Sequence, residues 1–273
     1  MGDQATVWTA LGATGESVMA LYAVARLLKS RDLGPAQLLP AIESNRADAV
    51  KLGARLEELF VRLRAATAHS SDLQDALEVL EPYANDVAAQ VAEAFRRNGP
   101  ARLGASERLL LESRAEQLGA ELEGIRLQLE LVCAALHAQP VDLLLANVVD
   151  GRPGLAPTFV AREASVEVDL ADDRGFSGDA QVLWSLIEAG LRQLSTTGDS
   201  FVLQAGTDGN GGLRLRIAPR ATPPAGESDR RQLRLSLGAS IRVEREVIAA
   251  VARYLGIGLQ FADEAPAVTI AVK

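Results

Sequence analysis

The side chains capable of covalent chemistry are few in this chain: two histidines, His69 and His137, and one cysteine, Cys133. His69 stands in Thr67–Leu73, where an exposed imidazole at a helix start could carry a phosphoryl group on nitrogen. The plainer interpretation is a solvated histidine at that position. His137 ends a helix, where a cation stabilises the dipole, and Cys133 is expected in the core. No spacing of histidine, cysteine and carboxylate residues matches a metal site.

Further along, the stretch Val166–Ala205 has the pattern of a strand, a helix and a second strand. Residues 166–170 alternate apolar and acidic side chains, as a half-buried strand does. Asp179 precedes a run of apolar residues at helical spacing, so we expect it to cap the start of that helix. Phe201–Ala205 is expected to be the second strand.

This layout resembles the GHKL family of ATPases, to which the ATP-binding domain of histidine kinases belongs. In that family an asparagine on this helix coordinates the magnesium ion of Mg-ATP. Matching Leu186–Leu194 to the family pattern places Ala189 at that asparagine, and Ser185 one turn earlier, where a second asparagine is common. Magnesium requires oxygen ligands, and alanine offers none. The resemblance therefore implies the domain without its metal ligand.

Two further nucleotide motifs of the family are missing. After the strand 213–217 the family has Asp-x-Gly-x-Gly, whose aspartate reads the adenine amino group, but this chain continues into Pro219 and further prolines. The last glycine motif, which would cradle phosphates with backbone N–H groups, reads Leu233–Gly238 (LRLSLG). Three motifs lost together predict that no nucleotide cofactor is bound.

The remaining segments complete the family's layout over residues 140–273. We expect a helix at Pro140–Val149, a hairpin turn rather than a phosphate loop at Asp208–Gly212, a short loop at the position of the ATP lid (Pro219–Arg231), a helix at Ile241–Leu255, and strands at 257–261 and 267–272. Trp184, on the same helix as Ser185 and Ala189, is expected in the core. The predicted fold class is α+β: an N-terminal helical hairpin or bundle followed by an α/β-sandwich GHKL-like domain.

A heptad pattern precedes that domain and predicts a long helix with an apolar seam that needs a partner helix. The seam consists of Leu111, Ala115, Leu118, Leu122, Ile125, Leu129, Val132 and Leu136. A second helix is expected at Ser71–Arg97, with a kink or a break at Pro82. Together, residues 66–139 resemble the dimerisation and phosphotransfer hairpin of sensor kinases, which implies a four-helix bundle in a homodimer. In that resemblance His69 lies near the phosphoacceptor position, but the acid that should follow it is replaced by Ser70.

Residues 1–65 are expected to form further helices, at Glu16–Leu28 and Pro35–Ala66, with no assigned sensing role. They could lengthen the bundle or fold back to cover the seam within one chain. Gly12–Gly15 lacks the lysine and hydroxyl residue of a phosphate-binding loop, so it predicts a loop and helix cap. Ser106 or Ser113 is expected near the start of the heptad helix.

Composition narrows the functional classes. The chain has 273 residues, 48% hydrophobic residues and a formal net charge of −8, and it has no basic stripe of the kind that binds nucleic acid. No apolar run reaches membrane-spanning length, and no signal peptide is evident. A single cysteine favours a reducing compartment. We therefore expect a cytoplasmic protein without a nucleic-acid or membrane partner.

Three functions remain open at this stage. The first is a non-catalytic, kinase-derived regulator that dimerises and binds a response-regulator receiver domain or another signalling partner without using ATP. The second is a histidine phosphotransferase that relays phosphate through His69. The third is an active ATP-dependent kinase, which would need Asp208 or Glu227 to rebuild a nucleotide site.

Overall fold

The computed structural model describes residues 2–30, 37, 40, 42–44, 46–47, 51–97, 105–151, 162–170, 175–207, 212–220, 230–238, 240–262 and 266–272. The chain separates into two compact units, Met1–Glu130 and Leu131–Lys273. The boundary falls inside one continuous helix, α5 (Ala105–Leu136). The segments 1–65 and 66–139, expected as separate domains, therefore contribute their helices largely to one unit.

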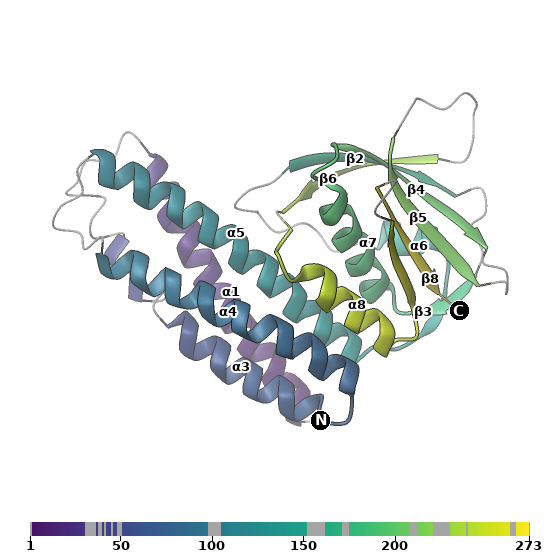
Figure 1. The fold of residues 1–273 in the computed structure, drawn as a ribbon, viewed down its shortest axis with the longest axis horizontal. Coiled ribbons are helices and arrows are strands. Elements are labelled where there is room, and N and C mark those ends of the chain that lie inside the picture. Colours follow the sequence, from purple (N-terminus) through teal and green to yellow (C-terminus); the bar gives the residue numbers. More distant parts are fainter. Residues whose placement is uncertain are drawn as a thin grey trace. The chain divides into compact units, whose positions relative to one another are not determined.

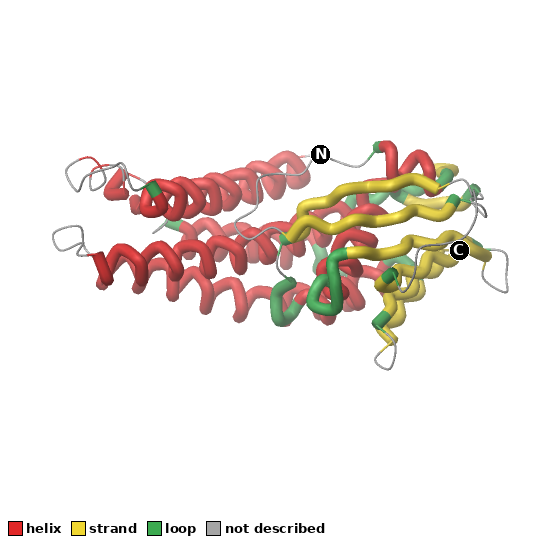
Figure 2. The backbone as a smooth tube through the Cα atoms, turned by 90° about the horizontal axis from the view of Figure 1, so that it is seen from above, coloured by secondary structure: helices red, strands yellow, loops and turns green. Residues whose placement is uncertain are grey.

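The first unit is a bundle of α1 (Gly2–Lys29), α3 (Leu52–Ala66), α4 (Ser71–Arg97) and the greater part of α5, which run side by side (Figures 1 and 2). Arg55 of α3 donates to the Ala13 carbonyl of α1 at 2.9 Å. Arg64 of α3 donates to Glu81 of α4 at 2.8 Å. These contacts join α1 to α3 and α3 to α4.

Helix α5 closes the bundle between α4 and α1. Arg114 of α5 donates to Gln90 of α4, and Arg108 of α5 donates to the Leu28 carbonyl of α1 at 2.9 Å. Lys29 of α1 pairs with Glu116 of α5, and the hydrogen bond that Lys29 donates to Glu116 raises the pKa of Lys29 above its ordinary value.

The heptad seam is therefore buried within a single chain. Seven of its eight residues are at most 3% exposed, and Leu136 is half-buried. The other three helices contribute apolar residues that are equally buried: Leu21, Val24, Leu28, Leu56, Leu59, Leu63, Leu73, Leu77 and Leu80. Burying a leucine stabilises a fold by about 1.5–3 kcal/mol. The seam does need partner helices, and helices of the same chain, α1 and α4 among them, lie against α5. Burial of this seam therefore does not require a second chain, and the expected homodimer stays a prediction.

The local expectations for the helical half have different outcomes. Helix α1 runs through Gly12–Gly15, where a loop was expected, and Thr14 donates to the Ala10 carbonyl at 3.1 Å, as a threonine inside a helix does. Helix α4 continues through exposed Pro82 without a break into two helices, and the alternative of a kink at Pro82 stays a prediction. Helix α5 begins at Ala105, so Ser106, one of the two serines expected near its start, lies in its first turn. The expected helix 35–66 is described from Leu52, and most earlier residues lie outside the described part.

The second unit is built on a six-stranded sheet of order β6-β2-β4-β5-β8-β7. Strands β2 and β4 are parallel, and the other neighbours are antiparallel. Strands β1 and β3 form a separate antiparallel pair. The elements in chain order are β1 (Val141–Leu143), α6 (Leu145–Asp150), β2 (Arg162–Asp169), β3 (Phe176–Gly178), α7 (Ala180–Leu194), β4 (Ser200–Thr207), β5 (Leu213–Pro219), β6 (Arg230–Leu237), α8 (Glu244–Tyr254), β7 (Gly258–Ala262) and β8 (Ala267–Val272).

Helices α7 and α8 cover one face of this sheet, as Figure 1 shows. The buried side chains alternate along each strand because successive residues point to opposite faces. Leu213, Leu215 and Ile217 of β5 lie under the helices, whereas Arg214 and Arg216 are exposed on the other face. The parallel pair β2–β4 is joined through α7, which is the crossover that a parallel pair requires.

The expected order of elements is confirmed over most of this unit. Asp179 caps α7 by accepting hydrogen bonds from the backbone N–H groups of Gln181 (3.0 Å) and Val182 (3.1 Å). Strands β4 and β5 form a hairpin in which Thr207 faces Leu213, although residues 208–211 of the turn lie outside the described part. One expectation is wrong: Pro140–Val149 is not a single helix. Val141–Leu143 pairs with β3, and α6 starts at Leu145. The fold class is α+β, a helical bundle followed by a mixed-sheet sandwich, as predicted.

Candidate functional site

Helix α7 holds the two positions at which the resemblance expects asparagines. Ala189 is completely buried, and Ser185, half-buried, donates its hydroxyl to the Gln181 carbonyl one turn earlier at 2.9 Å. The helix forms here because its apolar residues recur at helical spacing, so one side faces the sheet. Neither position therefore offers a metal ion a carboxylate or amide oxygen.

A buried group of charges lies beside these positions. The guanidinium of Arg192, 3% exposed, donates from Nε to Glu244 Oε1 at 2.7 Å and from a terminal nitrogen to Glu188 Oε1 at 3.0 Å. Glu244 is the first residue of α8 and is 1% exposed. Buried charges are tolerated when they are paired and hydrogen-bonded. This group therefore joins α7 to α8 through an ion-pair network.

The second oxygen of Glu244 is also engaged. Glu244 Oε2 accepts hydrogen bonds from Ser240 Oγ at 2.6 Å and from Gln193 Nε2 at 3.0 Å. Both carboxylate oxygens thus receive donors from the protein itself. A magnesium ion would have to displace these donors to use Glu244 as a ligand, because they occupy the lone pairs that would bind it.

At the positions of the two glycine motifs, the described residues belong to a strand or directly follow one, and residues 221–229 lie outside the described part. Pro219 is the last residue of β5, where it faces Phe201 of β4, and the next residue, Arg220, pairs with buried Glu167 at 3.1 Å. Leu233–Leu237 belong to β6, which pairs with β2 along its whole length. Backbone groups engaged in a ladder are not arranged in the concave loop that cradles a phosphate.

His69 lies in the turn between α3 and α4 and is exposed. The cap of α4 is its neighbour Ser70, whose Oγ accepts from the backbone N–H of Leu73 at 3.3 Å. His69 therefore lies directly before the first turn of α4, close to the helix start at which the sequence placed it. Its imidazole is accessible but is not placed by helical geometry.

The other residues considered for chemistry have structural positions. Cys133 is fully buried, and Trp184 is 2% exposed on α7, as expected of a core residue. His137 follows the last residue of α5 and is half-buried. Within the described residues, no group of three or more histidine, cysteine, aspartate and glutamate side chains could hold a metal ion.

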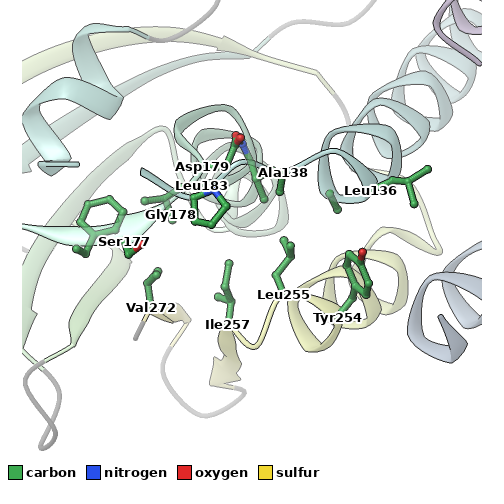
Figure 3. A pocket seen from close by; sticks show the side chains of 14 residues that line it. Leu136, Ala138, Ser177, Gly178, Asp179, Leu183, Tyr254, Leu255, Ile257 and Val272 are labelled. Atoms are coloured by element: carbon green, nitrogen blue, oxygen red, sulfur yellow. The ribbon is translucent and has the colours of Figure 1, made fainter. Parts of the chain in front are cut away.

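Reasoning from the sequence missed a cavity of about 400 Å³ in the second unit. It is formed by the last turn of α5, the segment after it, strand β3, the first turn of α7, the end of α8 and the end of β8 (Figure 3). Two lining residues had been singled out from the sequence for other reasons: Asp179 as a helix cap and Leu136 as part of the heptad seam. Nothing in the spacing of the other residues predicts that they meet.

Comparisons with known proteins give weak likenesses. No family model matches the chain, and no curated protein matches it. Among solved structures, the histidine kinase AdeS of Acinetobacter baumannii aligns with 75% of this chain and 98% of its own, at 12% identity and a TM-score of 0.36. The blue-light activated histidine kinase EL346 of Erythrobacter litoralis aligns with 74% of this chain and 60% of its own, at 14% identity and a TM-score of 0.26. These likenesses concern the fold alone.

Among the helices described, none is long and apolar enough to cross a bilayer.

Proposed function

We propose that this protein is a non-catalytic, kinase-derived regulator of two-component signalling, which binds a response-regulator receiver domain without using ATP. The observation that carries the proposal is the ion-pair network of Glu188, Arg192 and Glu244 beside the buried Ala189. At the place where the family's helix would present magnesium ligands, this chain has a methyl group and a set of charges that already satisfy one another.

The energetics oppose nucleotide binding at this place. Withdrawing one partner from a buried ion pair costs about 3–5 kcal/mol, because the other charge is left uncompensated. Mg-ATP would have to supply that energy before making any contact of its own. A regulator that binds a protein partner needs no such rearrangement.

A homodimer formed through the bundle remains part of the proposal, but it would use the outer surface of the bundle. Leu109 and Leu110 of α5 are about two-thirds exposed and offer apolar area for such a contact. Light scattering distinguishes the states: a mass of two chains supports the dimer, and a mass of one chain at high protein concentration contradicts it.

The second candidate function is phosphotransfer through His69, favoured by the exposure of that imidazole. In such a step a ring nitrogen would attack the phosphorus of a receiver's aspartyl phosphate. The N–P bond would form as the bond to the aspartyl oxygen breaks, leaving a free carboxylate, and the imidazole N–H proton would pass to solvent.

The third alternative, an active kinase, would require Asp208 or Glu227 to rebuild a nucleotide site, and both lie outside the described residues. Calorimetric titration with Mg-ATP tests it directly. We expect no heat of binding at micromolar to millimolar nucleotide, and saturable binding would overturn the main proposal.

Incubation with a panel of phosphorylated receiver domains separates the first two functions. A receiver retained by the protein with no label transferred is the outcome that the main proposal expects. Label that appears on the wild type and on a His137→Ala control, but not on His69→Ala, would instead establish the phosphotransferase. If the protein retains no receiver at all, both functions are wrong.

A further inference from the structure

The cavity of about 400 Å³ in the second unit lies at the first turn of α7, away from the nucleotide position. Ser185, Ala189 and Arg192 are not among the fourteen residues that line it. Its volume is within the range of about 300–1,000 Å³ that small-molecule sites occupy. Pro140 and Ser177 are exposed lining residues, so the cavity opens to solvent on their side.

Most of the cavity wall is apolar. Leu136 and Ala138 come from the end of α5 and the segment after it, Leu183 comes from α7, and Leu255 and Ile257 follow α8 (Figure 3). Such a wall favours a ligand with a hydrocarbon or aromatic body, because burying apolar area contributes about 25 cal/mol per Å². The wall alone does not choose among apolar ligands, so its polar groups decide the chemical class.

Asp179 is the only carboxylate among the fourteen described lining residues, and none of them is lysine, arginine or histidine. Its Oδ1 accepts from the backbone N–H groups of Gln181 and Val182, and its Oδ2 accepts from that of Gln139 at 3.1 Å. A carboxylate has about four acceptor positions, so Oδ2 can take one more donor. The hydroxyls of Ser177 and Tyr254 are the other polar side-chain groups on the wall.

The charge of the wall therefore has one sign. An anionic ligand would meet a carboxylate and no cation, whereas an ammonium group would gain a charge-assisted hydrogen bond to Oδ2. We propose that this cavity is a binding site for a small primary amine with an apolar body, its ammonium group on Asp179 and its body against Leu183, Leu255 and Ile257. This site is separate from the nucleotide position and does not depend on whether the protein binds a receiver.

The test uses a pair of probes that differ in charge alone: 3-phenylpropylamine and 3-phenylpropionate. Ligand-observed NMR and calorimetry on the full chain measure binding of each. We expect saturable binding of the amine and none of the carboxylate. If the amine does not saturate at millimolar concentration, or if both probes bind equally, the proposal is wrong.

Three variants locate the site. Asp179→Asn keeps a residue that caps helices well but removes the charge, and we expect it to weaken amine binding at least about tenfold. Asp199→Asn, a change of the same kind at an exposed aspartate that does not line the cavity, should bind like the wild type. Ala138→Phe places a ring in the cavity and should abolish binding.

Circular dichroism melting shows whether each variant is folded. If Ala138→Phe fails to fold, the comparison of Asp179→Asn with Asp199→Asn decides the matter alone. Equal amine affinity in those two variants, or undiminished binding in a folded Ala138→Phe protein, would overturn the proposal.

Discussion

The two halves of helix α7 differ in how the protein fills the space beside them. The half that carries Ala189 and Arg192 is closed, with a buried guanidinium held between Glu188 and Glu244. The first turn, which carries Asp179, Val182 and Leu183, borders an open cavity. The sequence resemblance assigns a ligand site to the first region, but buried side chains fill it. No sequence motif predicts a site in the second region, yet it borders a cavity of about 400 Å³. A position that a resemblance assigns to a ligand therefore does not predict binding when the side chains around that position fill the space.

The largest expected effect comes from opening the closed region. Glu244→Ala leaves Arg192 buried without its main partner, so we expect the free energy of unfolding to fall by about 3–5 kcal/mol. Urea unfolding followed by circular dichroism measures it. Glu246→Ala, an exposed acid two residues along the same helix, is the matched control and should change stability by less than about 0.5 kcal/mol. Equal effects of the two changes would mean that the network contributes nothing.

A smaller effect is expected from placing an asparagine at position 189, where the resemblance expects one. Ala189 is completely buried, so Ala189→Asn inserts a larger polar group into a packed core and should cost about 1–3 kcal/mol. The same variant should still show no heat on titration with Mg-ATP. Ser185→Asn, at a half-buried position, is the comparison and should be tolerated better. Nucleotide binding by Ala189→Asn would contradict the conclusion that the region around Ala189 and Arg192 is closed to ligands.

A weaker loss of stability is expected at the first turn of α7, where a substitution of Asp179 removes the helix cap. Asp179→Ala removes the acceptor for two backbone N–H groups at the start of α7, so we expect a loss of about 0.5–2 kcal/mol in the free energy of unfolding. Asp179→Asn, which retains an acceptor, should lose less. Thermal melts of the two variants side by side check the order. If Asn is as damaging as Ala, the negative charge and not the cap stabilises this end of the helix.

The smallest effect is expected outside both regions, at His69. Because this residue is exposed in a turn, His69→Ala should change the free energy of unfolding by less than about 0.5 kcal/mol. Ser70→Ala, at the neighbouring residue, is the comparison: it removes the cap of α4 and should lower the free energy of unfolding by about 1 kcal/mol. Urea unfolding of both variants provides the check, and a large loss in His69→Ala would reveal a structural role that its exposure does not indicate.

The sequence by itself determined the elements whose cause is local. Several features depend on neighbours within a few positions, so their pattern is visible in the sequence. They are the alternation in residues 166–170, the cap at Asp179, the helical spacing after it, and strands β4 and β5. The same holds for the heptad of α5 and for the absence of an asparagine at Ala189. Together with the resemblance to the GHKL layout, these features predicted the fold class.

The tertiary structure alone decided what those elements meet. Arg192 and Glu244 are 52 residues apart in the chain, and the cavity gathers residues from Ala135 to Val272. The heptad pattern of α5 predicts that the seam is buried against other helices. It does not predict whether those helices belong to the same chain, because apolar side chains pack equally well in either case. Helices of the same chain supply it here, with α1 and α4 hydrogen-bonded to α5. Burial of apolar surface has no direction that a sequence pattern could record.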